Sequence, residues 1–410
     1  MTGPREHAAS YRSVLASEQF RRLWLAHLLS VAGDQLARVA LTVLVFDRTR
    51  SAGLAALTYA LTYLPDLLGG AALAQLADRF SRRTVMVAAD LVRAVLVAAM
   101  ALPVLPLTVR IVLLVAVQLA AAPFQAARSA ILPDILPGDR LTVGIGIMQT
   151  TYQAGLALGF GAGAAVVTGL GPSGALLADA ATFALSALVI RTGLPPHHPP
   201  ATPEHPPPRQ HRRHTLAGWR IVLGDPQLRA LLAIACCSGF YVVPEGLAVP
   251  YAAQLGGGTP AAGWLLAANP VGTVAGLLLL RRVPPGLRLH WLGALAVATS
   301  AVLLPTGWAP ALPVSVALWT LSGALSAHDM ITNAAYVTHA PAHLRGQAIG
   351  IAIASLRTAQ GLAVITAGLL AQAFAPSTVI TAAAATGVCA AGAAALAWTR
   401  AQAKPTPTGK

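Results

Sequence analysis

Long apolar stretches, each able to cross a bilayer as a helix, follow one another along this chain of 410 residues. A helix needs about 20 predominantly apolar residues to span the hydrocarbon core of a membrane. Hydrophobic residues make up 56% of the sequence and charged residues only 10%, whereas a soluble domain carries about 25% charged residues. So few charges cannot cover a water-facing surface, and the sequence therefore predicts a polytopic membrane protein.

The apolar stretches predict an all-α fold with twelve transmembrane helices. A backbone in lipid must satisfy its own hydrogen bonds, and the strands of a β-barrel would alternate apolar and polar residues. The expected spans are 22–46, 52–77, 84–102, 108–127, 142–168, 173–191, 228–249, 260–280, 289–306, 312–334, 346–373 and 377–399.

A proline-rich run at 194–216 follows the sixth span and divides the chain into six plus six. Proline breaks a helix and favours extended geometry, so we expect a cytoplasmic linker here. Its histidines match no metal-ligand spacing, and neither a metal nor a cofactor is expected. The expected domains are an N-terminal six-helix bundle at 1–193, the proline- and histidine-rich linker at 194–225, a C-terminal six-helix bundle at 226–400 and a cytoplasmic tail at 401–410.

The two halves share short segments at matching positions. The run G-I-G-I at 144–147 begins the fifth span, and G-I-A-I at 350–353 begins the eleventh. The run G-L-A follows at the same offset in both halves, at 155–157 and 361–363. Two similar bundles related by a pseudo-two-fold axis are the architecture of one large class of transporters.

The formal net charge of +14 would suit a nucleic-acid-binding protein, but the positions of the arginines exclude that interpretation. They cluster in short loops on one side of the expected spans, which is the positive-inside pattern. We therefore expect a multi-pass protein of a bacterial plasma membrane with both termini cytoplasmic. Its expected partners are the lipid bilayer and a small-molecule substrate, with no nucleic acid, and it is expected to be a monomer.

The loop between the second and third spans, at 74–83, reads A-Q-L-A-D-R-F-S-R-R. It resembles the G-x-x-x-D-R-x-G-R-R/K signature of the major facilitator superfamily. Asp78, Arg79, Arg82 and Arg83 match the charges of that signature, while alanine and serine replace its glycines.

Three further segments resemble the drug- and siderophore-exporter branch of that superfamily, which includes enterobactin and macrolide exporters. They are F-R-R-L-W-L-A-H-L-L-S-V-A-G-D at 20–34, A-R-S-A-I-L-P-D-I-L-P at 127–137 and R-T-A-Q-G-L-A at 357–363. The resemblance extends over the whole chain and implies secondary transport by alternating access, with a central cavity lined by spans one, four, seven and ten.

The same resemblance implies a gate in the 74–83 loop. In the family, the aspartate corresponding to Asp78 docks on the start of span eleven, here near 345–347, and holds the cytoplasmic side closed. An aspartate at a helix end accepts hydrogen bonds from arginines and from the N-terminus of a facing helix. The arginines alone are equally explained as determinants of topology.

Ionisable side chains inside a span are candidates for proton or substrate contact, because each costs at least about 2.5–3.5 kcal/mol to insert. Asp34 and Arg38 lie one turn apart and either pair on one helix face or serve the cavity. Glu245 follows a proline in span seven, and Asp329 follows a histidine in span ten.

Four further features complete the candidates. Asp66 follows a proline in span two and is expected near the extracellular mouth of the cavity, and Arg357 needs a partner from another helix or an anionic substrate. Asp90 and Arg93, three residues apart, are expected to form a structural pair. Small residues four apart allow helices to approach closely, and such a set lies at Gly155, Gly159 and Gly163.

Three functions fit these observations. The first is a proton-driven exporter of a hydrophobic or amphiphilic small molecule, such as a drug, an antibiotic or a siderophore-like product. The second is an importer of a small metabolite in the same fold. The third is a membrane enzyme or sensor, which we do not expect, because the sequence lacks the nucleophile motif G-x-S-x-G. It also lacks the G-x-x-x-x-G-K-[ST] motif, so the proton gradient is the expected energy source.

Overall fold

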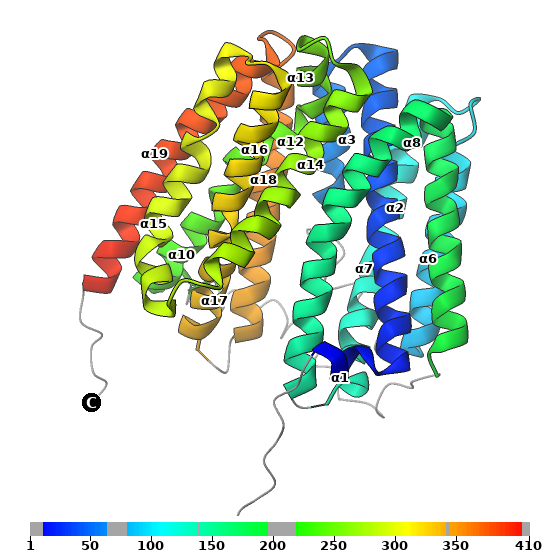
Figure 1. The fold of residues 1–410 in the computed structure, drawn as a ribbon, viewed down its shortest axis with the longest axis horizontal. Helices are drawn as coiled ribbons and strands as arrows, with labels where there is room; N and C mark the ends of the chain where they lie inside the picture. Colours follow the sequence, from blue (N-terminus) through cyan, green and yellow to red (C-terminus); the bar gives the residue numbers. More distant parts are fainter. Residues whose placement is uncertain are drawn as a thin grey trace, which may run out of the picture. The chain divides into compact units, whose positions relative to one another are not determined.

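The computed structural model describes residues 11–63, 80–137, 139–195, 219–220, 222–341 and 345–403. Every regular element in this part of the chain is a helix, so the expected all-helical class is confirmed there (Figure 1). The chain divides into two compact units, of which the first comprises Met1–Ala40 and Leu68–Thr202 and the second Leu41–Leu67 and Pro203–Lys410.

The first part of the chain folds into a short helix followed by long ones. They are α1 (Tyr11–Leu15), α2 (Glu18–Thr49), α3 (Ala52–Ala60) with the 3-10 turn η1 (Leu61–Tyr63), α6 (Arg82–Met100), α7 (Leu107–Ile135) and α8 (Asp139–Gly193). Helix α8 is broken at Gly171, whose φ of 71° is a left-handed value that favours glycine. This break, with Pro172 after it, separates the expected fifth and sixth spans.

The rest of the chain contains shorter helical pieces between long helices. They are α10 (Pro226–Cys236), α11 (Ser238–Tyr241), α12 (Val243–Gly246), α13 (Ala248–Gln254), α14 (Gly258–Leu280), α15 (Pro285–Ala301), the 3-10 turn η2 (Leu304–Trp308), α16 (Leu312–Ser326), α17 (His328–His339), α18 (Arg345–Leu370) and α19 (Pro376–Ala403).

Eight helices among the described residues are long and apolar enough to cross a membrane. The other four expected spans do not each form a separate helix of this kind among the described residues. Span 52–77 lies partly outside the described residues, and α6 carries too many charges. The fifth and sixth spans both belong to α8, on either side of its break at Gly171, and the tenth is divided between α16 and α17 at Ala327.

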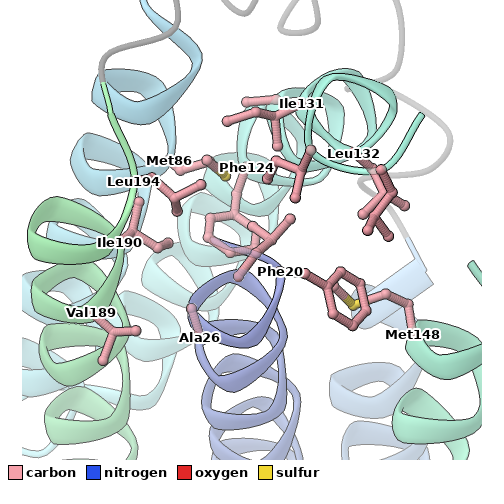
Figure 2. Close-up of a cluster of buried hydrophobic side chains, with 14 of the residues drawn as sticks. Phe20, Ala26, Met86, Phe124, Ile131, Leu132, Met148, Val189, Ile190 and Leu194 are labelled. Carbon is pink, nitrogen blue, oxygen red and sulfur yellow. The ribbon is translucent and has the colours of Figure 1, made fainter. Parts of the chain in front are cut away.

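The core of the first unit is a cluster of apolar side chains from α2, α6, α7 and α8. Figure 2 shows Met86 of α6 beside Phe124 of α7, and Phe20 of α2 beside Met148 of α8. Phe20, Met86 and Ile190 are fully buried. Burying such a side chain contributes about 1.5–3 kcal/mol, so these contacts bind the four helices into one body.

The second unit has its own core, between α10, α15, α17, α18 and α19. Leu228, Leu231 and Ile234 of α10 are fully buried there, and Trp398 of α19 is almost fully buried. Helices α15 and α19 run side by side in Figure 1.

The segment 41–67, which the sequence analysis placed in the N-terminal bundle, groups with the second unit by its contacts. Helix α3 packs closely on α18, because glycines on both helices leave room for the backbones. A Cβ atom at Gly53 would lie 3.2 Å from the carbonyl oxygen of Gly368, and one at Gly368 would lie 3.3 Å from Cα of Gly53.

The glycines that the sequence analysis singled out in span five lie along α2. A Cβ atom at Gly155 would lie 2.8 Å from Val31, and one at Gly159 would lie 2.7 Å from Gln35. The next glycine, Gly163, stands 3.4 Å from the side chain of Val39 by the same measure. The spacing of four is thus repeated on both helices, as close helix packing requires.

A second close contact joins α14 and α16. A Cβ atom at Gly272 would lie 2.8 Å from the backbone nitrogen of Ala324, and one at Gly323 would lie 2.9 Å from the carbonyl carbon of Asn269. The two backbones are therefore in direct contact, with no side chain between them.

We expect Gly323→Ala to destabilise the protein by about 1–3 kcal/mol, because the added methyl group meets backbone atoms that cannot rotate away. The matched control is Gly350→Ala in α18, where a Cβ atom has no neighbour within 4 Å. That control should stabilise its helix by about 0.5–1 kcal/mol. Thermal unfolding of the two purified variants measures the difference, and equal melting temperatures would contradict the close contact.

Candidate functional site

Arg93 of α6 is the centre of a buried polar group in the first unit, which we call the Arg93 cluster: Asp34, Asp90, Arg93 and Asp179. The guanidinium is 1% exposed. Its Nη2 donates to Oδ1 of Asp34 at 2.5 Å and its Nη1 lies 3.3 Å from Oδ1 of Asp90. The arginine therefore links α2 to α6 through charge-assisted hydrogen bonds, which are stronger than neutral ones.

Neutral groups add further hydrogen bonds to this cluster. Ser30 of α2 accepts from Nη1 of Arg93 at 3.0 Å, and the Ser186 hydroxyl of α8 donates to Oδ2 of Asp90 at 2.6 Å. The guanidinium also lies over the ring of Phe183, 3.9 Å from its centroid, where a cation is attracted to the aromatic face. Asp90 and Arg93 thus form the pair that their spacing predicts, but within a larger network.

The partner of Asp34 differs from the one expected. Its ion pair is with Arg93 on α6 and not with Arg38, although Arg38 is one turn away on the same helix. The side chain of Arg38 lies instead near Phe160 of α8, 5.8 Å from the ring centroid. The physical reason is that a long arginine side chain from a neighbouring helix reaches the carboxylate as easily as one from the same helix.

Asp179 of α8 also belongs to the cluster, although it was not among the residues expected to have a role. Its side chain is fully buried, and the charges of Asp34, Asp90 and Arg93 act on it. The sequence does contain a pattern that indicates a polar site at Asp179. Thr182 and Ser186 follow it at three and seven residues and so share its helix face.

The 74–83 loop is described only in part. Asp78 and Arg79 lie outside the described residues, as does Asp66, so their expected roles stay predictions. Arg82 forms an ion pair with Asp134 of α7 and donates to the carbonyl oxygen of Ala130 at 2.8 Å.

Arg83 donates to the carbonyl oxygen of Leu194, at the end of α8, at 2.9 Å. Together with the Arg82 contacts, this hydrogen bond fastens the start of α6 to the ends of α7 and α8. Both arginines are thus structural anchors within the first unit, whatever role they have in topology.

Glu245 is the first of two candidate acids in the second unit. It lies in the short helix α12, one of four pieces into which residues 226–254 are broken, next to Pro244. The hydroxyl of Tyr59 on α3 donates to its carboxylate. Tyr59 is 1% exposed, so the donor of this hydrogen bond between distant parts of the sequence is buried.

Arg357 of α18 lies close to the same segment. Its guanidinium lies near Tyr63, 5.6 Å from the ring centroid, and its Nη1 donates to Gln360 at 3.1 Å. The amide of Gln360 donates in turn to Ser238 at 3.2 Å. Residues 59–63 thus meet polar groups of α12 and α18 within the second unit.

Asp329 is the second acid of this unit and stands in the first turn of α17, where the helix dipole favours a negative charge. The Tyr241 hydroxyl donates to its Oδ2 at 2.6 Å, and Nε2 of His328 lies 3.6 Å from its Oδ1. The His328 ring is fully buried, with Nδ1 3.0 Å from the carbonyl oxygen of Leu325.

A small hollow within the second unit lies beside Glu245. Tyr241 and Glu245 contribute polar groups to its wall, and Asn269 of α14 contributes an amide. The remaining lining is mostly apolar and comes from Pro244, Leu303, Trp319 and Ser322.

Among the described residues, no group of three or more histidine, cysteine, aspartate or glutamate side chains is arranged to hold a metal ion. What these helices do share is a set of carboxylates within spans, each held by a donor from another helix. Charged groups placed in this way mark substrate and ion pathways in membrane transport proteins.

Comparison with known proteins agrees with the class of membrane transport proteins. The family model described as the Major Facilitator Superfamily matches residues 23–310, and the chain belongs to that superfamily. It is therefore a multi-pass membrane protein. A curated relative from Bacillus subtilis (strain 168), named as the uncharacterized MFS-type transporter YkuC, is 26% identical over 185 residues. The matched region covers 44% of this chain and 42% of that relative.

Solved structures share the fold. A POT family transporter in complex with a thioalcohol-conjugated peptide has a TM-score of 0.74 at 11% identity, over 94% of this chain and 96% of its own. A bacterial homologue of the human lysosomal transporter Spinster, in an inward-facing and occupied conformation, has a TM-score of 0.67 at 16% identity, over 97% and 96%. At these identities the likeness shows the fold alone.

Proposed function

We propose that this protein is a secondary transporter with twelve spans in two six-helix bundles, which works by alternating access. It exports a hydrophobic or amphiphilic small molecule in exchange for protons. The observation that carries this proposal is the set of carboxylates held between helices: Asp34 by Arg93, Glu245 by Tyr59 and Asp329 by Tyr241. Such pairs exchange partners when a proton or a ligand binds, which couples binding to movement of helices.

Two observations support a hydrophobic or amphiphilic substrate and the outward direction. The hollow beside Glu245 combines apolar walls, such as Trp319, with few polar groups. The segments at 20–34, 127–137 and 357–363 resemble the drug- and siderophore-exporter branch of the superfamily. The proposal further places the protein in a bacterial plasma membrane as a monomer, with both termini cytoplasmic and the gate at Asp78 on that side.

Import of a small metabolite is the second candidate. It is supported by the shared fold with a POT family transporter whose structure holds a conjugated peptide. The polar groups of Tyr241, Glu245 and Asn269 in the lining of the hollow would suit such a ligand.

Transport in cells distinguishes the two directions. The protein is expressed in a bacterial strain that lacks its own multidrug pumps, and accumulation of a panel of lipophilic compounds is measured with and without a protonophore. We expect lower accumulation of at least one compound than in cells with the empty vector, and the protonophore should abolish the difference. Raised uptake would favour the importer, and no change across the panel would contradict the export of lipophilic compounds.

A further inference from the structure

Asp179 is a buried carboxyl group with an incomplete set of hydrogen bonds. Its side chain is 0% exposed. Thr182 Oγ1 lies 3.3 Å from Oδ1, whereas Oδ2 is buried and has no hydrogen-bond partner among the described residues. An ionised carboxylate in such a place is costly, because burial removes water and nothing replaces it at one of the two oxygens.

The charges around Asp179 are unbalanced. From the helices packed against α8, the charged groups that act on it are Asp34 of α2 and Asp90 and Arg93 of α6. If all of them were ionised, three carboxylates would share one guanidinium. Arg93 already donates to Asp34 and to Asp90, and like charges confined at short range are not all ionised together. One bound proton removes part of the excess negative charge.

The three acids differ in how they are held. Asp90 is fully buried and accepts hydrogen bonds from both Ser186 and Arg93, which offset part of the cost of burying its charge. The Asp34 side chain is 27% exposed and bound to the guanidinium. Asp179 has the poorest stabilisation of its charge and is therefore the group that gains most from a proton.

The backbone of α2 connects Asp179 to the more exposed acid. Gly33, the neighbour of Asp34, lies directly against Asp179 and Thr182. A Cβ atom at this glycine would lie 3.3 Å from Cγ of Asp179. The contact places the backbone of α2 directly against the carboxyl group of Asp179, so a change in the charge of Asp179 acts on the position of α2.

We propose that Asp179 is a proton-binding site of the first unit. The proton adds to the carboxylate of Asp179 to give the neutral acid and is released again as a proton, while Arg93 keeps its charge throughout. The use of this proton in transport rests on the proposed function, but the existence of the site does not.

Infrared difference spectroscopy on the purified full-length protein tests the site directly, because a neutral carboxylic acid has its own C=O stretching band. We expect the band in the wild-type protein and its complete loss in Asp179→Asn. The matched control is Asp47→Asn, which changes an exposed acid near the end of α2 and should leave the band intact. A band that persists in Asp179→Asn would overturn the assignment.

A second variant keeps the test valid if Asp179→Asn does not fold. Thr182→Val removes the hydroxyl group next to Asp179 and keeps the size of the side chain. We expect it to shift the frequency of the band, because the hydrogen bonding of the acid changes. An unchanged frequency would overturn the assignment as well.

The spectroscopic and transport experiments test the proton site and the proposed function independently of each other. A band that depends on Asp179, in a protein without protonophore-sensitive transport, would contradict the proposed function and leave the proton site standing. Protonophore-sensitive transport with a band that Asp179→Asn does not alter would leave the function standing and remove the proton site.

Discussion

Replacement of Arg93 by methionine should destabilise the protein by about 3–5 kcal/mol, which is the cost of breaking a buried ion pair by removing one partner. The carboxylates of Asp34 and Asp90 would lose their shared guanidinium. Phe183 would also lose the cation above its ring. Thermal unfolding, followed by the loss of monodisperse protein in detergent, measures the effect.

Two further variants show whether charge is the cause. Arg93→Met combined with Asp34→Asn and Asp90→Asn removes the uncompensated carboxylates and should recover most of the lost stability. The control Arg22→Met breaks an exposed ion pair with Glu18, at 3.3 Å, and such pairs contribute about 0–1 kcal/mol. A triple variant as unstable as the single one would show that packing, and not charge, makes Arg93 important.

Transport should fall by about 10- to 100-fold in Tyr59→Phe, since a hydrogen bond to a charged group contributes about 1.5–3 kcal/mol. The tyrosine is buried and its hydroxyl donates to Glu245 across two segments that are far apart in the sequence. Initial rates of substrate movement in reconstituted vesicles give the loss, with the amount of inserted protein measured in parallel.

The same pair can be examined by a double-mutant cycle. We expect Tyr59→Phe, Glu245→Gln and the double variant to lose similar amounts of activity, because each removes the same interaction. Tyr63→Phe is a suitable control, because it keeps the ring that faces Arg357. Losses that add up in the double variant would show that the two residues act independently.

The helices of this protein were predictable from the sequence because length and hydropathy decide them. Helix α14 at Gly258–Leu280 and α18 at Arg345–Leu370 fall close to the expected spans 260–280 and 346–373. The break at Ala327 was not predictable, because no proline or glycine marks it in the sequence.

The contacts between helices were much less predictable. Sequence spacing shows which residues share a helix face, and it correctly suggested that Gly155 and Gly159 permit a close approach, but it does not identify α2 as the neighbour. For the same reason it offered Arg38 as the partner of Asp34, whereas the structure has Arg93. Asp179 acquires a role only when α2, α6 and α8 are placed together.

The contact between α14 and α16 has a mechanical consequence. Because backbone meets backbone at Gly272 and Gly323, no side chain is available to change rotamer and let one helix slide along the other. We therefore expect the two helices to move together as one rigid body during any rearrangement of the second unit. A spectroscopic label on either of them reports the movement of both, and the pair provides a fixed frame against which motion of α12 or α17 can be measured.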